Sequence, residues 1–93
     1  MPSAYQGIGI SKESWSEYQK LIKDPLSAPF VLQALRSIQH DRHNYGRPLR
    51  AKPFHGGPMR TYVIALPRDR QLWLYWNPMM TSTTVVTLAV LSP

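Results

Sequence analysis

Residues 60–91, RTYVIALPRDRQLWLYWNPMMTSTTVVTLAVL, contain three apolar runs separated by two turn signals. The runs at 61–66, 71–77 and 83–91 are rich in β-branched and aromatic residues, a composition that is typical of strands. The short polar and proline-containing segments between them predict tight turns. Because tight turns join neighbouring strands that run in opposite directions, this part of the chain predicts a three-stranded antiparallel sheet.

The second and third predicted strands are apolar on both faces. In the second, Leu72, Leu74 and Trp76 alternate with Trp73 and Tyr75. No charged side chain occurs from residue 71 to residue 93. We expect such strands to be covered on both faces, or to leave a face or the edge of the last strand for another chain. The three aromatic residues are expected to belong to the core, with a base-stacking platform as the alternative.

The composition indicates one small basic domain spanning residues 1–93, with a formal net charge of +6. Eight of the eleven Lys and Arg residues fall between Arg36 and Arg70, and a basic cluster of this kind favours a nucleic-acid or nucleoprotein partner. The absence of cysteine excludes a disulfide scaffold, a thiolate zinc site and a cysteine nucleophile. With no signal-peptide pattern and no long apolar run, we expect a cytoplasmic protein without a membrane segment.

The N-terminal half predicts a weak strand at 4–10 and then two amphipathic helices. The first helix follows Ser11 and stops at Asp24-Pro25, because a residue before proline disfavours helical geometry. The second follows Ser27 and has an apolar stripe made of Phe30, Val31, Ala34, Leu35 and Ile38. A loop at 44–60 then leads to the strands. We therefore predict an α+β fold in which two N-terminal helices pack on an antiparallel sheet of three to four strands.

Two groups of basic residues are candidates for nucleic-acid contacts. The loop at 44–60 carries aromatic side chains among its cations, so it could hold single-stranded RNA by charge and stacking. The turn between the first two predicted strands carries two arginines that could reach phosphates. The alternative for both groups is plain solvation. The predicted nucleic-acid-binding set is Arg47, Arg50, Lys52, Arg60, Arg68 and Arg70.

Cleavage of RNA by attack of its 2′-hydroxyl needs a base, an acid and a cation near the phosphate. The candidates for these roles are His55, Arg60 and Arg70. His55 precedes two glycines that would let the backbone approach a phosphate, and its alternative role is to fill a turn. His40 and His43 could supply two metal ligands, but cations at a helix end explain them better. We predict no metal and no cofactor.

Four segments resemble the RelE/ParE superfamily, the toxins of bacterial type II toxin–antitoxin pairs. ISKESWSEYQKL is similar to the first helix of the family, and FHGGPMRTYVIAL to the entry into its second strand. LWLYW is similar to the third strand and TVVTLAVL to the last. The resemblance implies a RelE-like fold, a toxin that inhibits translation, and a cognate antitoxin as partner. A homodimer formed through an uncovered sheet face or edge strand is a separate expectation from the apolar strands.

In the RelE branch, the resemblance implies ribosome-dependent mRNA cleavage by basic side chains on the second and third strands and after the last. The corresponding positions here hold Val63, Ala65, Leu72 and Ser92-Pro93, none of which is basic. An active ribonuclease would therefore need a non-standard site. A ParE-like inhibitor of DNA gyrase and a non-catalytic nucleic-acid-binding or regulatory protein on the same fold are the alternatives.

Overall fold

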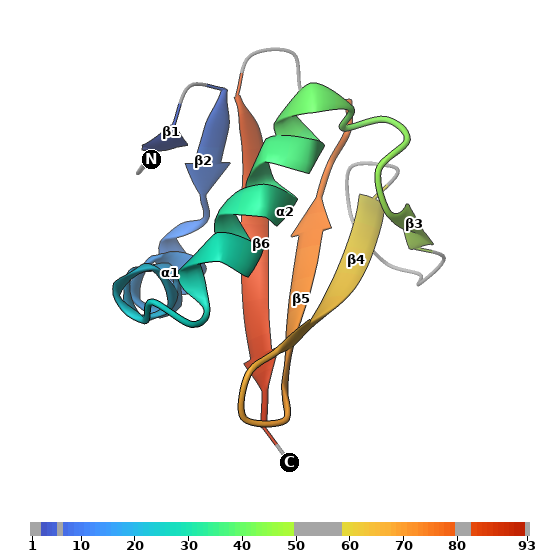
Figure 1. The fold of residues 1–93 in the computed structure, drawn as a ribbon. Coiled ribbons are helices and arrows are strands. Elements are labelled where there is room, and N and C mark those ends of the chain that lie inside the picture. The colour runs from blue at the N-terminus through green and yellow to red at the C-terminus, as the bar shows by residue number, and fades with distance from the viewer. Residues whose placement is uncertain (1–2, 6, 50–58, 80–82, 93) are drawn as a thin grey trace.

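The computed structural model of the chain describes residues 3–5, 7–49, 59–79 and 83–92. Within these ranges, six strands form one sheet in the order β1-β2-β6-β5-β4-β3, with two helices packed against it (Figure 1). The helices are α1 (Trp15–Lys23), which follows a short 3-10 turn at Lys12–Ser14, and α2 (Ala28–His40). The strands are β1 (Ser3–Tyr5), β2 (Ile8–Ile10), β3 (Arg47–Leu49), β4 (Met59–Leu66), β5 (Arg70–Trp76) and β6 (Thr84–Leu91).

The α+β class is confirmed, but the prediction of a wholly antiparallel sheet of three to four strands is wrong. The sheet is mixed, because β2 runs parallel to β6, with Ile8 opposite Thr84 and Ile10 opposite Val86. A parallel pair needs a long connection, and here the helices and the β4–β5 hairpin supply it. The predicted strand at 4–10 is a hairpin of β1 and β2, so the N-terminus adds two strands.

The predicted loop at 44–60 contains a third addition to the sheet. β3 pairs with β4 in antiparallel register, with Arg47 opposite Thr61. Proline cannot donate a hydrogen bond to a neighbouring strand and is therefore confined to sheet edges. Pro48 lies on such an edge strand. Because proline disfavours strands, the sequence predicted a loop for this segment. Residues 50–58 of the predicted loop lie outside the described residues.

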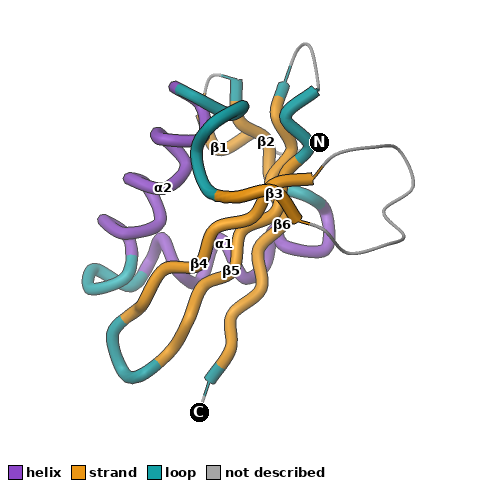
Figure 2. The backbone as a smooth tube through the Cα atoms, turned by 90° about the vertical axis from the view of Figure 1, so that its right-hand side faces the viewer, coloured by secondary structure: helices purple, strands orange, loops and turns teal. Residues whose placement is uncertain are grey.

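The two helices take different positions on the sheet. α2 crosses one face of the central strands, whereas α1 lies beside β6 beyond the end of β2 (Figures 1 and 2). Pro29 stands in the first turn of α2, where a proline costs no hydrogen bond. Phe30, however, was expected on the buried stripe and is 47% exposed. None of the helices in the described residues is long and apolar enough to cross a membrane.

The hydrophobic core lies between the helices and the strand faces turned toward them. Trp76 is its largest side chain and is fully buried, and the Trp76 indole N–H donates a hydrogen bond to the Arg42 carbonyl at 2.9 Å. The other buried apolar residues are Ile8, Ile10, Tyr18, Leu21, Val31, Ala34, Leu35, Ile38, Leu66, Leu72, Leu74, Val86 and Leu88.

The last strand is an edge strand only in part, since its first residues lie between β2 and β5. β2 pairs only with the first residues of β6. Beyond that point, the side chain of Ser14 forms hydrogen bonds with the backbone of β6. The Leu88 N–H donates to Ser14 Oγ at 2.8 Å, and that hydroxyl donates to the Leu88 carbonyl at 3.1 Å. A serine thus satisfies the backbone groups that a neighbouring strand would otherwise have paired.

Candidate nucleic-acid interface

The face of the sheet opposite α2 carries a mixture of aromatic, hydroxyl and basic side chains. Successive side chains of a strand point to opposite faces. Because Leu72, Leu74 and Trp76 point into the core, Trp73 and Tyr75 point the other way. The strand registers put Arg47, Thr61, Val63, Val85 and Thr87 on the same face. Within the described residues no helix crosses this surface, which we call the open face.

The two aromatic residues of the open face stand next to each other on β5. Their ring centroids are 6.4 Å apart and their planes are inclined by 22°. The Trp73 indole N–H donates to Gln71 Oε1 at 3.3 Å, which restrains the ring. Both rings are half-buried. The expectation that all three aromatic residues of this strand belong to the core is therefore confirmed for Trp76 and wrong for Trp73 and Tyr75.

A small cavity opens on this face beside Trp73. Its volume is about 210 Å³, and it is lined by Arg47, Thr61, Tyr62, Val63 and Trp73. Thr61 is only 6% exposed, and its Oγ1 atom is buried without a hydrogen-bond partner. Buried hydroxyls in proteins almost always have a partner. The site therefore combines an apolar wall with a polar atom whose hydrogen bonds are unmade.

Among the described residues of the predicted set, Arg47 is the one that lies on the open face. Its side chain is exposed, and it makes no hydrogen bond or ion pair with the other described residues. The β3–β4 register places it directly opposite Thr61, so its charge stands at the rim of the cavity. An unpaired guanidinium in this position can bind a phosphate or another anion by donating hydrogen bonds to it.

Arg60 faces the other way and is committed to the backbone of the turn before β3. Its Nε donates to the Tyr45 carbonyl at 2.8 Å. Its Nη2 donates to the carbonyls of Asn44 at 3.0 Å and Gly46 at 2.9 Å. Three carbonyl acceptors leave the guanidinium little capacity for a phosphate, so its position indicates a structural role.

Arg68 and Arg70 meet the link between the helices at the far end of the sheet. The Nη2 atom of Arg70 donates to Ser27 Oγ at 2.9 Å and lies 3.5 Å from Asp24 Oδ2, while Arg68 Nη1 lies 3.7 Å from that oxygen. A hydrogen bond from the Ser27 hydroxyl, then one from the Leu26 N–H, holds the pKa of Asp24 below its usual value, and the two arginines lower it further. These cations thus pair with a carboxylate of their own chain.

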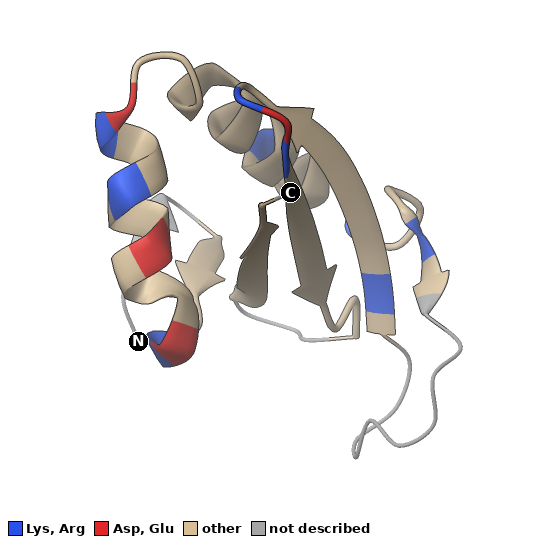
Figure 3. Cartoon of the chain, turned by 90° about the horizontal axis from the view of Figure 1, so that it is seen from below, with Lys and Arg blue, Asp and Glu red and all other residues tan. Residues whose placement is uncertain are grey.

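The structure separates the predicted catalytic residues that it describes. Arg60 pairs with Trp76 at one end of the β4–β5 ladder, and Arg70 pairs with Leu66 at the other. Six residues of strand separate them, which corresponds to about 20 Å. Figure 3 shows the basic residues divided between the β3–β4 end of the sheet, the β4–β5 turn, α1 and α2. His55, Arg50 and Lys52 lie outside the described residues.

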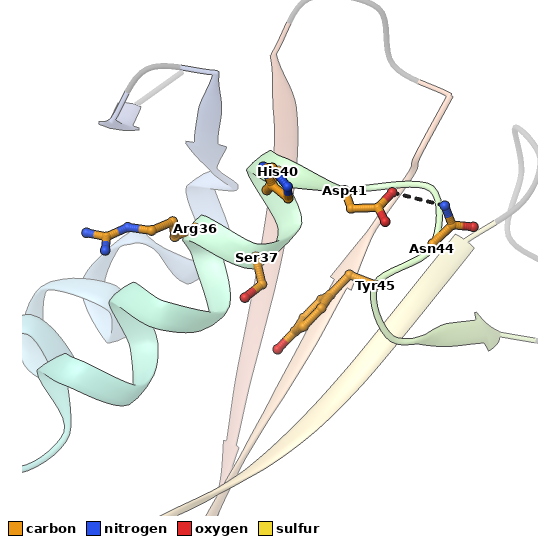
Figure 4. Close-up of a pocket in the computed structure, with 6 residues that line it drawn as sticks. All are labelled: Arg36, Ser37, His40, Asp41, Asn44 and Tyr45. Atoms are coloured by element: carbon orange, nitrogen blue, oxygen red, sulfur yellow. Dashed lines mark hydrogen bonds between the residues drawn. The ribbon is translucent and has the colours of Figure 1, made fainter.

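A second hollow lies on the helix side of the sheet, between the end of α2 and the turn that follows (Figure 4). Its volume is about 470 Å³. Burial raises the pKa of the Tyr45 hydroxyl, the neighbouring Tyr62 adds to the rise, and a hydrogen bond with Ser37 opposes it. Asp41 accepts a hydrogen bond from Asn44 at 3.1 Å, and Arg36 extends away from these residues. The lining residues are Arg36, Ser37, His40, Asp41, Asn44 and Tyr45.

His40, the last residue of α2, and His43, in the turn that follows, do not form part of a metal-binding cluster in the described portion of the chain. No group of three or more His, Cys, Asp or Glu residues in that portion is arranged to hold a metal ion.

Comparison of the chain with protein-family models, curated proteins and solved structures finds no match. The RelE/ParE resemblance therefore stays a prediction, and the function is argued from the site.

Proposed function

We propose that this protein binds single-stranded nucleic acid, with RNA as the first candidate, on the open face of its sheet, and that binding rather than cleavage is its activity. The observation that carries the proposal is the pair Trp73 and Tyr75, half-buried and stacked on the central strand. Aromatic rings on an exposed surface stack with bases of any sequence. The net charge of +6 and the unpaired Arg47 supply attraction for the phosphate backbone.

The contacts of the two described candidate arginines support binding rather than cleavage. Arg60 holds three backbone carbonyls, and Arg70 is joined to Ser27 and Asp24. Neither is free to stabilise charge on a scissile phosphate, and they stand about 20 Å apart. Binding needs only stacking and charge, and both are available on one surface.

The proposal is tested by fluorescence anisotropy with a labelled oligouridine about a dozen nucleotides long, a length within the range that single-strand-binding folds cover. Replacing Trp73 with Ala is expected to weaken binding by about 5- to 150-fold, which corresponds to the 1–3 kcal/mol of one stacked base. Phe30→Ala is the matched control, because it also removes a partly exposed aromatic ring but from α2. Equal losses in the two variants, or no binding by the unaltered protein at low salt, would contradict the proposal.

Salt supplies a second readout from the same assay. For single strands, the logarithm of the affinity falls with the logarithm of salt concentration with a slope of about −0.7 per neutralised phosphate. Replacing Arg47 with Gln is expected to make that slope shallower by about this amount. Arg36→Gln is the control, since Arg36 stands on α2, and it is expected to leave the slope nearly unchanged.

A toxin of a type II toxin–antitoxin pair is a second candidate, and the order of the elements favours it. Two helices precede a meander of three strands, β4, β5 and β6, which is the order that the RelE/ParE resemblance implies. In this setting an antitoxin would be the partner and the translation machinery the target, with DNA gyrase as the ParE-like alternative. Tightly induced expression in a bacterial host tests the idea: unchanged viable counts would remove it, and a supercoiling assay would separate the two targets.

A further inference from the structure

Among the described residues, Thr61 differs from buried serines whose hydroxyls have partners within the fold. The hydroxyl of Ser14 is bonded to both backbone groups of Leu88, and the Ser27 hydroxyl to Asp24 at 2.8 Å. The Oγ1 atom of Thr61 is the one buried side-chain nitrogen or oxygen atom in the described residues that lacks a partner. Removing a hydroxyl from water without a replacement bond is costly. The atom therefore gains a bond if a ligand in the adjoining cavity displaces the groups that cover it.

The surroundings of this hydroxyl limit what the ligand can be. The cavity of about 210 Å³ is smaller than the roughly 300 Å³ at which pockets for drug-sized ligands begin, so it admits one small ring system. Val63 and the indole of Trp73, which stand opposite each other on neighbouring strands, offer it an apolar surface. Arg47 adds an unpaired positive charge at the rim.

We propose that this cavity takes a single unstacked nucleobase, with Trp73 against its ring, Thr61 Oγ1 bonded to its polar edge and Arg47 at the phosphate of the same nucleotide. The inference rests on the proposed function and assigns one subsite within it. The hydroxyl both donates and accepts, so this contact alone selects for the presence of a base rather than for one base. A duplex, whose bases are paired and stacked, cannot enter, and the subsite therefore selects single strands.

Thr61→Val tests the subsite because valine keeps the shape of threonine and replaces only the hydroxyl, with a methyl group. With no partner in the free protein, the hydroxyl contributes nothing favourable, so the variant is expected to be at least as stable to heat as the unaltered protein. A fall in the melting temperature would mean that the hydroxyl has a partner within the fold, and it would overturn the inference. Thr61→Ser, which keeps a hydroxyl, is the matched control.

Uridine monophosphate is the probe, and ribose 5-phosphate, which has the same sugar and phosphate without the base, is its comparison. Binding is followed through the NMR signals of the Val63 methyl groups and the Trp73 indole N–H. We expect the nucleotide, and not the sugar phosphate, to shift both signals, and Thr61→Val to bind it about fivefold more weakly, the loss of one neutral hydrogen bond. Thr61→Ser is expected to bind it nearly as the unaltered protein does.

The outcomes separate this inference from the proposed function. Equal shifts with both probes would reduce the site to an anion site at Arg47, and equal nucleotide binding by Thr61→Val would remove the hydroxyl from it. Either result overturns the subsite, while oligouridine binding that depends on Trp73 would still support the proposed function. If the unaltered protein binds neither oligouridine nor the nucleotide, both proposals fall together.

Discussion

Arg60 on β4 holds the backbone at Tyr45, with its Nε atom 2.8 Å from the Tyr45 carbonyl oxygen. The neighbouring carbonyls of Asn44 and Gly46 accept from the same guanidinium. The tyrosine ring packs in turn against Tyr62 and Trp76, with centroid distances of 4.7 and 6.0 Å. The arginine therefore fixes the turn that leads from α2 into β3 and, through β3, the position of Arg47 on the open face.

Replacing Arg60 with Lys is expected to lower the free energy of unfolding by about 1–3 kcal/mol, because an ammonium group cannot reach three carbonyls in the geometry of a guanidinium. Urea unfolding measures the change. Arg36→Lys, at an exposed position of α2, is the control and is expected to stay within about 0.5 kcal/mol. If Arg60→Lys keeps full stability but loses RNA binding, Arg60 contacts the ligand directly and its structural assignment is wrong.

Gly46 cannot be replaced by alanine without a large loss of stability. Its φ of 72° is one that L-residues rarely adopt, and an added Cβ would lie 2.4 Å from the Thr61 carbonyl oxygen and 2.9 Å from the Trp76 ring. We expect Gly46→Ala to cost about 2–4 kcal/mol of stability by urea unfolding. Gly7→Ala is the control, because its φ of 84° is equally unfavourable while its nearest neighbour is 3.6 Å away. It should cost about 1 kcal/mol, and equal costs would show that the contact with Thr61 and Trp76 is unimportant.

Removing the Ser14 hydroxyl is expected to lower the stability of the fold by more than the small size of the group indicates. Ser14→Ala leaves the N–H and carbonyl of Leu88 buried without a partner and also removes the acceptor of the Ser11 hydroxyl, which lies 3.0 Å away. We expect a loss of about 1–3 kcal/mol in the free energy of unfolding, with faster amide exchange at Leu88. Ser16→Ala, at an exposed site of the following helix α1, should change stability by less than about 0.5 kcal/mol. Unaltered amide exchange at Leu88 in Ser14→Ala would argue against this role.

Asp24 makes stability depend on pH in acid. Its pKa is lower in the folded chain than in the unfolded chain, chiefly because of the Ser27 hydroxyl. Its stabilising contribution is therefore complete above the ordinary carboxyl pKa of 3.8 and disappears as the pH falls through the lower, folded value. The unaltered protein should be more stable than Asp24→Asn near neutral pH, and the difference should shrink below about pH 4 in urea unfolding. A difference that stays constant down to pH 3 would contradict this assignment, and Glu13→Gln serves as the exposed-carboxylate control.

The elements with strong periodic patterns could be predicted from the sequence, and the short ones could not. The two helices and the β4–β5–β6 meander follow from apolar spacing and turn residues. β1, β2 and β3 have three residues each, too few for a period to be visible, and their pairing depends on partners far along the chain. The parallel pairing of β2 with β6 could be predicted only by knowing which distant segments of the chain come together.

The site could be predicted only in part, because local sequence does not show which face of a strand is covered. The alternation in LWLYW separates Trp73 and Tyr75 from Leu72, Leu74 and Trp76, but only the position of α2 decides which set is buried. The roles of Arg60 and Arg70 likewise depend on carbonyl and carboxylate partners that lie 14 to 46 residues away in the chain. No sequence signal marks the unpaired hydroxyl of Thr61.

The central claim is that nucleic acid binds to the open face, and two indole signals from one strand test it most directly. Trp73 and Trp76 both stand on β5 but on opposite faces, and the Trp76 N–H is already bonded to the Arg42 carbonyl. In an NMR titration with oligouridine, the Trp73 indole signal should shift strongly while the Trp76 signal stays in place, with Trp73→Phe used to assign them. A shift of Trp76 together with residues of the hollow beside α2, and none at Trp73, would contradict the account.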